Sequence, residues 1–337
     1  MNITYERETG HCEKSPYIKE VTIKTVEPAE NSDNLDKVTF LEIGWDAITR
    51  RGDYNSGNKV MFIPPESVLP LELGEKLGIT NYLSKGRVRV AKLRGNRSEG
   101  LIVDRDIVEP YIPFILKWED LPSVHMKGEL LSLSKISIDF LKFYKMPNIL
   151  NEPDTFEIGE KLSCAEKIHG TNFRCGRLLH PIENEFVDYV GSHNTVLKEP
   201  EEAGKNIYWD VFRKSLQGRI PEGIVLFGEI FGLGIQHISY DRKKPDVLLF
   251  AAMHRGIYLS KDILIQICTE CCLPYIPTTY INFESIEQVR ELAESPSDLT
   301  KSHGREGIVL TSLERPDRMA KCISFKYLTG KNRKERH

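Results

Sequence analysis

The segment of this chain with the clearest chemical potential is residues 165–173, which read AEKIHGTNF. Its Lys167 carries a primary amine that becomes a nucleophile once it loses its proton, which a free lysine holds with a pKa of about 10.4. Gly170 follows three residues later, where the missing Cβ would let the backbone turn closely around a ligand. A surface lysine before a turn glycine would give the same short pattern, so the interpretation depends on the elements downstream.

Four further elements follow this segment in order: LFGEIFG at 226–232, VLLF at 247–250, REGIVL at 305–310, and Lys321. Glu229 and Glu306 each lie beside a glycine in a short apolar run, so we expect both to project from strand ends into a cleft. Either carboxylate alone could be a structural group bound by backbone amides. Two of them together with Lys167 indicate a reactive site.

The string EKIHGTNF and its ordered followers resemble the covalent nucleotidyltransferase superfamily, and specifically ATP-dependent RNA ligases of the phage nick-sealing and kinetoplastid editing types. The resemblance covers about residues 148–326. It implies that Lys167 takes AMP from ATP, that the AMP passes to an RNA 5′-phosphate, and that a 3′-hydroxyl then expels it. Ends at duplex nicks are the expected substrate, and RNA repair is the expected role.

The resemblance also implies roles for individual residues. Lys167 and Lys321 are the expected catalytic residues, because a lysine at the α-phosphate offsets charge that develops there. Glu229 and Glu306 are expected to place Mg²⁺ (or Mn²⁺), since hard cations prefer oxygen ligands. The expected ATP-binding residues are Glu166, Lys167, Gly170, Thr171, Asn172, Glu229, Phe250, Glu306 and Lys321. Phe250 is the expected stacking platform for adenine, although a phenylalanine in an apolar strand is more often a core residue.

Two positions depart from the family pattern. His193 stands in the element GSHN, residues 191–194, where the family usually places an arginine or lysine. Lys321 lacks the second lysine that many relatives carry two residues away, and Lys326 is a candidate replacement.

Basic residues gather in the amino-terminal part of a chain whose net charge is −3. Between Lys85 and Arg97 there are six lysines or arginines and no carboxylate, a pattern typical of selective contact with phosphates. A solvated strand face explains the pattern equally well. The expected RNA-contacting residues are Asn172, His193, Arg87, Arg89, Lys92 and Arg94.

The pattern of elements predicts an α+β protein. Residues 1–105 are predicted to form an OB-type β-barrel, residues 106–147 a connector, and residues 148–337 an α+β nucleotidyltransferase domain similar in size to an ATP-grasp domain. The expected strands of the barrel include Tyr17–Val26, Val38–Ile43, Lys59–Ile63 and Arg87–Leu93. The connector is expected to contain one helix around Ile136–Tyr144. The barrel would either hold RNA or close over the phosphates of ATP.

Composition excludes several other classes of protein. The 337 residues are 40% hydrophobic and 28% charged, and no apolar run approaches the ~20 residues of a membrane helix. Seven scattered cysteines and a charged start indicate a soluble cytoplasmic protein, which we expect to be a monomer without membrane partners. Ser260 is predicted to cap a helix that runs into Cys268–Cys272, which favours buried thiols over zinc.

The sequence leaves two alternative functions open. A DNA ligase or a GTP-dependent capping guanylyltransferase would share the chemistry, but both usually carry an OB domain after the catalytic domain. Only sixteen residues follow Lys321, too few for a barrel. A nucleic-acid-binding protein with an inactive nucleotidyltransferase domain is opposed by the presence of Lys167, Glu229, Glu306 and Lys321. We expect Lys167→Ala to abolish adenylylation with almost no change in stability, since a cleft side chain packs little.

Overall fold

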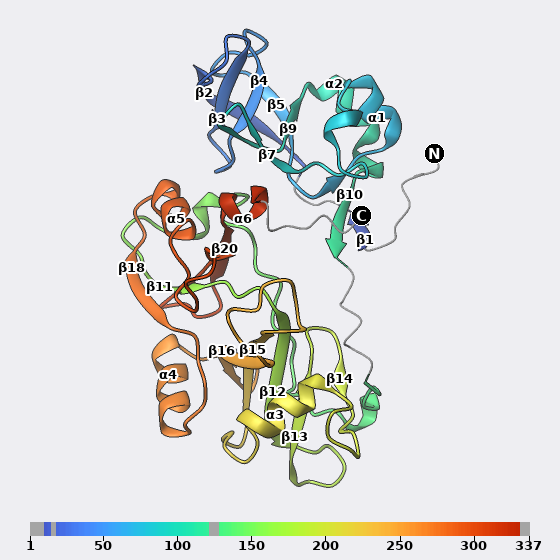
Figure 1. The fold of residues 1–337 in the computed structure, drawn as a ribbon, viewed down its shortest axis with the longest axis vertical. Helices are drawn as coiled ribbons and strands as arrows, with labels where there is room; N and C mark the ends of the chain where they lie inside the picture. Colours follow the sequence, from blue (N-terminus) through green and yellow to red (C-terminus); the bar gives the residue numbers. More distant parts are fainter. Residues whose placement is uncertain (1–9, 15–17, 121–127, 331–337) are drawn as a thin grey trace. The chain divides into compact units, whose positions relative to one another are not determined.

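The computed structural model describes residues 10–14, 18–120 and 128–330, which form two compact units (Figure 1). Unit 1 comprises Met1–Pro122, Ile149–Asp154 and Phe325–His337, and unit 2 comprises Ser123–Asn148 and Thr155–Ser324. The described residues of the predicted connector, 106–147, are divided between the two units, and residues 325–330 belong to unit 1.

Unit 1 contains a five-stranded antiparallel sheet. Its strands are β2 (Lys19–Pro28), β3 (Leu35–Phe40), β4 (Ala47–Arg50), β5 (Lys59–Ile63) and β9 (Leu101–Val103). They lie in the order β4-β3-β2-β5-β9. Alternate residues of β2 and β3 are buried, including Val21, Ile23 and Val38, as expected for strands with one face on a core. The predicted strands at 17–26, 38–43 and 59–63 correspond to β2, β3 and β5.

The predicted strand Arg87–Leu93 is only partly present. Residues Val90–Leu93 form β7, which pairs with β8 (Asn96–Glu99) in a hairpin. Arg87 lies before this strand, where its guanidinium donates to Glu66 Oε2 at 3.0 Å and stacks over the ring of Trp118. Of the basic residues in the predicted strand, only Lys92 therefore lies within β7.

The remaining elements of unit 1 pack around the sheet. A second sheet has the order β1-β10-β6, with strands β1 (Gly10–Lys14), β10 (Leu116–Asp120) and β6 (Ser67–Val68). The helices are α1 (Leu71–Lys76), α2 (Arg105–Val108) and α6 (Phe325–Thr329), with 3₁₀ turns η1 (Thr80–Tyr82) and η2 (Glu109–Phe114). Ile63, Leu69 and Leu73 are fully buried in one of its cores.

Unit 2 is built on two antiparallel sheets. The six-stranded sheet has the order β14-β13-β12-β15-β16-β17, and the four-stranded sheet has the order β18-β11-β19-β20. The strands of the first are β14 (Val196–Leu197), β13 (Phe186–Gly191), β12 (Thr171–Leu179), β15 (Ile224–Phe231), β16 (Asp246–His254) and β17 (Ile257–Tyr258). Those of the second are β18 (Thr278–Asn282), β11 (Lys161–Glu166), β19 (Gly307–Ser312) and β20 (Met319–Ile323).

Helices cover one face of the six-stranded sheet. The buried residues of α3 (Ile207–Ser215) and α4 (Lys261–Glu270) share a core with β12, β15 and β16. A third helix, α5 (Ile286–Ala293), contacts β19 and β20. Ser260 caps α4 by accepting a hydrogen bond from the amide of Ile263, and Cys268 is buried in this helix. The capped helix predicted at Ser260 is therefore confirmed.

The helix predicted around Ile136–Tyr144 is absent. Beyond the 3₁₀ turn η3 (Leu133–Lys135), this segment is irregular and packs on the second face of the six-stranded sheet through Phe140 and Phe143. The hydroxyl of Tyr144 bonds both the amide and the carbonyl of Met319, at 2.8 and 2.9 Å. The segment is anchored by these contacts to strands rather than by hydrogen bonds within a helix, so local periodicity was misleading.

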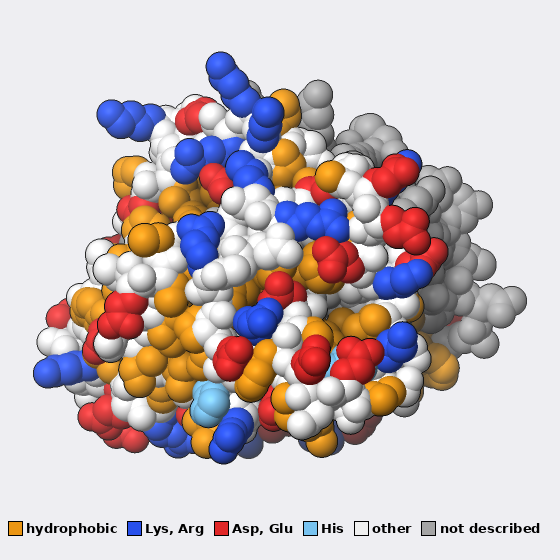
Figure 2. Space-filling model, turned by 90° about the horizontal axis from the view of Figure 1, so that it is seen from below, with side chains coloured by type: hydrophobic (Ala, Val, Ile, Leu, Met, Phe, Trp, Pro, Cys, Tyr) orange, Lys and Arg blue, Asp and Glu red, His pale blue; other side chains and the backbone are white. Residues whose placement is uncertain are grey.

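The surface is mixed in character. Figure 2 shows one face on which lysine and arginine side chains are interspersed with acidic ones, while hydrophobic side chains gather on one side. None of the helices in the described residues combines the length and apolar character needed to cross a membrane.

Candidate active site

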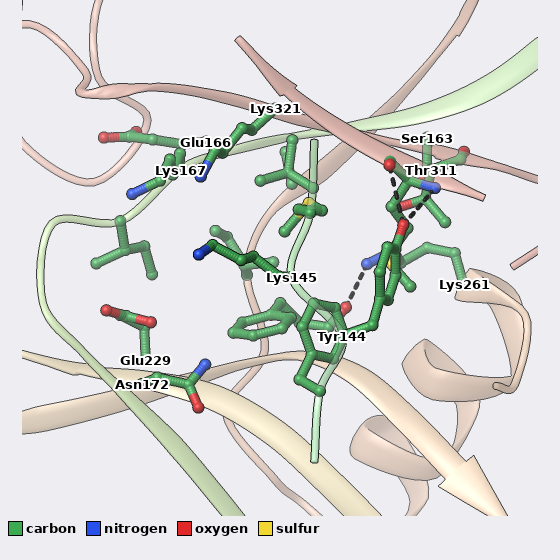
Figure 3. Close-up of a pocket in the computed structure, with 18 of the residues that line it drawn as sticks. Tyr144, Lys145, Ser163, Glu166, Lys167, Asn172, Glu229, Lys261, Thr311 and Lys321 are labelled. Carbon is green, nitrogen blue, oxygen red and sulfur yellow. Dashed lines mark hydrogen bonds between the residues drawn. The ribbon is translucent and has the colours of Figure 1, made fainter. Parts of the chain in front are cut away.

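Unit 2 contains a cavity of about 300 Å³ that opens between the irregular segment around Tyr144 and both sheets (Figure 3). Seven of the predicted site residues line it: Glu166, Lys167, Asn172, His193, Glu229, Phe250 and Lys321. Residues more than 150 positions apart in the sequence therefore meet at one site.

Strand pairing places Lys167 beside Glu306. Strand β11 ends at Glu166, which is paired with Ile308 of β19, and the amide of Lys167 donates to the carbonyl of Gly307. Glu306 immediately precedes β19, and its Oε1 lies 2.7 Å from Lys167 Nζ. Gly307 is needed here because a Cβ would lie 2.1 Å from the carbonyl oxygen of Cys322.

The pKa values in this pair move in opposite directions. Burial alone would lower the pKa of Lys167, but the negative charges of Glu306 and Glu229 outweigh it and raise that pKa. Burial alone would raise the pKa of Glu306, but the charge of Lys167 and a hydrogen bond from His169 lower it to about 2. In the absence of ligands the pair is therefore ionised at neutral pH, with the amine protonated.

Two histidines extend this network. His169 Nδ1 lies 3.4 Å from Glu306 Oε2, and its Nε2 lies 3.0 Å from Nδ1 of His237. The backbone amide of His169 donates to the hydroxyl of Tyr240 at 2.7 Å. His237 and Tyr240 are residues that sequence reasoning missed, because nothing in the loop around them marks their approach to Lys167.

Glu229 and Asn172 face the cavity from adjacent strands. They are paired across β12 and β15, so their side chains lie on the same face of the sheet. Burial raises the pKa of Glu229 to about 8, although the charge of Lys167 acts in the opposite direction. The Oδ1 atom of Asn172 is buried without a hydrogen-bond partner among the described residues. The carboxylate of Glu229 and the side-chain amide group of Asn172 therefore both line the cavity.

Gly170 permits the close approach of β15. A Cβ at this position would lie 2.2 Å from the carbonyl oxygen of Ile230 and 2.8 Å from Cγ of Glu229. The glycine thus allows strand β15, and with it Glu229, to come next to Lys167.

Phe250 reaches the cavity because of a β-bulge. Phe227 and Gly228 of β15 pair with Ala251 and Leu249, which leaves Phe250 without a partner residue on that strand. Bulges re-aim side chains in this way. The carbonyl of Phe250 accepts a hydrogen bond from Nζ of Lys261 at 2.5 Å. Phe250 lies within strand β16, as the apolar run in the sequence predicted.

Two cavity-lining lysines were missed by the sequence analysis. Lys145 extends into the cavity from the irregular segment, and Figure 3 shows its amine on the side of Lys167 and Lys321. The sequence predicted a connector helix that ends just before Lys145. A lysine directly after Phe143 and Tyr144 was the only signal of a possible site residue. Lys261 lines the opposite side. Lys321 lies on β20, and its backbone amide donates to the carbonyl of Pro147.

Other predicted residues are engaged elsewhere. The carboxylate of Glu166 accepts hydrogen bonds from the hydroxyl of Ser297 and the amide of Asp298, at 2.7–2.9 Å. The hydroxyl of Thr171 lies 2.9 Å from that of Tyr208 in α3, and Thr171 does not line the cavity. Lys326 lies on α6 in unit 1.

The predicted RNA-contacting residues in the amino-terminal part all belong to unit 1. Lys92 and Arg94 are exposed on the β7–β8 hairpin, and Arg94 adopts a positive φ of 50° in its turn. Arg89 is half-buried, and Arg87 is held by Glu66.

Two carboxylates near Lys167 fit a divalent cation: Glu229 lines the cavity, and Glu306 is paired with Lys167 but is not itself among the lining residues. Both supply hard oxygen donors, and the charge of Glu306 contributes, after burial, to the raised pKa of Glu229. The Oε2 atom of Glu306 is buried without a well-formed hydrogen bond among the described residues. Oxygen atoms of this kind are the ligands that Mg²⁺ and Mn²⁺ prefer.

This fold and cavity define a ligase domain of the covalent nucleotidyltransferase type. Residues 160–327 match the sequence model of the family described as RNA ligase. The chain belongs to the RNA ligase family.

Solved structures support the same fold. The chain is similar to Naegleria gruberi RNA ligase with PPi, at a TM-score of 0.76 and 21% identity over 93% of this chain and 98% of that one. One lysine-to-alanine variant of that ligase, with ATP and Mn, gives the same values. A second lysine-to-alanine variant, also with ATP and Mn, gives a TM-score of 0.73 and 21% identity over 94% of this chain and 98% of that one. The comparison with curated proteins finds no match to this chain.

Proposed function

We propose that the protein is an ATP-dependent RNA ligase that joins RNA 3′-hydroxyl and 5′-phosphate ends through a lysyl-AMP intermediate on Lys167. The observation that carries this proposal is the position of Lys167 within an RNA ligase domain. Its amine is paired with Glu306 and lies at a cavity that is also lined by the aromatic ring of Phe250, the carboxylate of Glu229 and three further lysines. The structurally similar Naegleria ligase has been solved with ATP and Mn, with AMP and Mn, and with PPi.

In the first step the amine of Lys167 attacks the α-phosphorus of ATP. A P–N bond forms, the bond from that phosphorus to the leaving oxygen breaks, and pyrophosphate departs with the electron pair. Since Glu306 holds the amine in its protonated form, the ion pair must break and the ammonium group must release a proton to solvent before it attacks. Glu229 and Glu306 would hold Mg²⁺ or Mn²⁺, and such a cation supplies positive charge that offsets these carboxylates and the phosphates.

The other cavity residues would position the nucleotide. Phe250 offers a ring on which the base stacks, and Asn172 offers its side-chain amide group to a ribose hydroxyl. Lys145 and Lys321 lie on the same side of the cavity as Lys167 and are suited to phosphate oxygens. Phe250, Asn172, Lys145 and Lys321 all belong to this chain, so one copy of it can position the nucleotide and offset the charge of its phosphates.

In the second step a phosphate oxygen of the RNA 5′ end attacks the phosphorus of lysyl-AMP, and the P–N bond breaks. In the third step a 3′-hydroxyl attacks the 5′-phosphorus and AMP leaves. We propose nicks in a duplex as the substrate, with His193 at the cavity as a contact to the end. The protein then acts in RNA repair as a monomer.

We also propose that unit 1 is an OB-type barrel that contacts RNA. When the five strands are numbered in chain order, they lie in the sheet in the order third, second, first, fourth and fifth. The two edge strands, β4 and β9, contact each other. This order fits a five-stranded, partly open barrel. The exposed Lys92 and Arg94 on the β7–β8 hairpin offer phosphate contacts.

The proposal is tested with α-labelled ATP and GTP in the presence of Mg²⁺. We expect acid-resistant, hydroxylamine-sensitive label from ATP alone, followed by sealing of a nicked RNA strand in preference to a nicked DNA strand. Label from GTP alone would replace the proposal with a capping enzyme, and equal sealing of DNA would replace it with a DNA ligase. No label from either nucleotide would leave a binding protein.

A further inference from the structure

A buried amine in the cavity has no role in the steps above. Lys261 is the first residue of α4, is only 9% exposed and lines the cavity together with Phe250. Figure 3 draws it across the cavity from Lys167 and Lys321, on the side away from the expected phosphates. Lysine is rarely buried without a partner, so this position calls for a function.

The hydrogen-bonding capacity of Lys261 is largely unused. Its Nζ donates to the carbonyl of Phe250 at 2.5 Å, whereas an ammonium group has three donors. Among the described residues no carboxylate pairs with this amine. Burial lowers its pKa to about 8, and the amino-terminal end of a helix also disfavours positive charge. A ligand atom that accepts a hydrogen bond here would therefore relieve an unfavourable environment.

The bond to Phe250 fixes the amine next to the proposed stacking ring. The bulge in β16 turns Phe250 into the cavity, and Lys261 binds the carbonyl of that same residue. A base stacked on the ring would bring one of its edges near Nζ. The neighbouring cavity walls include the apolar side chains of Ile276 and Met319 and the hydroxyls of Ser163 and Thr311, so Lys261 supplies the only ammonium group on this side of the described cavity. The amine is thus held in place before a nucleotide enters.

We propose, as an extension that rests on the ATP-dependent function above, that Lys261 donates a hydrogen bond to ring nitrogen N1 of adenine and selects ATP over GTP. Adenine N1 is an acceptor, whereas guanine carries a hydrogen on N1 that would face another donor. Sites built to bond a particular group discriminate strongly against an analogue that lacks it. Lys261 is thereby the residue that determines nucleotide specificity.

The test compares nucleotide analogues in the wild type and in Lys261→Met. We measure kcat/KM for adenylylation with ATP, with 1-deaza-ATP, which lacks the N1 acceptor, and with 7-deaza-ATP. The wild type should use 1-deaza-ATP about 10-fold less well than ATP and should use 7-deaza-ATP nearly as well. Lys261→Met should lose about 10-fold on ATP and should no longer distinguish ATP from 1-deaza-ATP. Lys214→Met, at an exposed lysine of α3, makes the same chemical change and should behave as the wild type.

Each other outcome has a defined meaning. Equal use of ATP and 1-deaza-ATP by the wild type overturns the inference without any variant, even if Lys261→Met fails to fold. A uniform loss on all analogues in Lys261→Met, with the discrimination retained, shows that Lys261 only holds the bulge, and it also overturns the inference. Label from ATP in either case leaves the ligase function intact, whereas no label with ATP overturns both.

Discussion

Replacement of Lys167 by alanine should abolish adenylylation and also destabilise unit 2. The sequence alone predicts almost no loss of stability, but the structure pairs this side chain with a carboxylate that is only 10% exposed. Removal of one partner from a buried ion pair leaves the other charge without compensation. The free energy of unfolding should therefore fall even though Lys167 lies at a cavity.

The pKa of Glu306 gives the size of this effect. It falls from 4.5 to about 2, a difference of about 2.5 units, which corresponds to roughly 3 kcal/mol at neutral pH. His169 supplies part of this and remains in the variant, and the cost of burying Lys167 is removed with the side chain. We therefore expect a net loss of about 1–2 kcal/mol, or a decrease in Tm of about 2–8 °C.

The effect should depend on pH with a definite sign. A lowered pKa for Glu306 contributes stability that is fully present above its unfolded pKa of 4.5 and is lost as pH falls toward about 2. The difference in Tm between the wild type and Lys167→Ala should thus shrink from pH 7 to pH 3.

The assay is thermal unfolding followed by circular dichroism at both pH values, with labelling by ATP as the activity measurement. Lys161→Ala is the matched control, since this lysine is exposed at the start of the same strand, β11. The double variant Lys167→Met with Glu306→Gln should recover stability but not labelling. An unchanged Tm for Lys167→Ala at pH 7, or a loss of the same size at pH 3, would refute the reasoning.

Three further variants test other parts of the structure. Gly170→Ala should lower stability by about 1–3 kcal/mol and abolish labelling, because its Cβ would lie 2.2 Å from the carbonyl of Ile230; a wild-type melting curve would contradict this. Lys145→Ala should raise the ATP concentration for half-maximal labelling about 10-fold while changing the free energy of unfolding by less than about 0.5 kcal/mol, and unaltered ATP dependence would remove this residue from the phosphate site. Lys92→Ala combined with Arg94→Ala should leave labelling intact and reduce the salt dependence of RNA binding, with the log–log slope smaller by about 1–2; an unchanged slope would exclude these contacts.

The chemical identity of the site is readable from the sequence because it is carried by short local strings. AEKIHGTNF, the Gly-Glu element and REGIVL each mark a strand or a strand end, and strand pairing then brings Lys167, Glu229 and Glu306 together. The strands β2, β3 and β5 and the capped helix α4 were also predictable, since alternation and capping are local signals.

What could not be predicted depends on contacts between distant residues. The segment around Phe143 has apolar spacing compatible with a helix, yet its aromatic side chains pack on β15, β16 and β20 and hold it irregular, which also brings Lys145 to the cavity. The bulge at Phe250 and the bond from Lys261 arise from a register shift between two strands. No pattern in a single strand reveals such a shift.

The most direct test of the central claim is to locate AMP on the protein. The wild type is incubated with ATP and Mg²⁺, digested, and analysed by mass spectrometry for a peptide that carries AMP. We expect the modification on Lys167 alone, and its release as AMP when RNA with a 5′-phosphate at a nick is added before digestion. AMP on Lys145, Lys261 or Lys321 instead, or label that RNA ends do not discharge, would contradict the account.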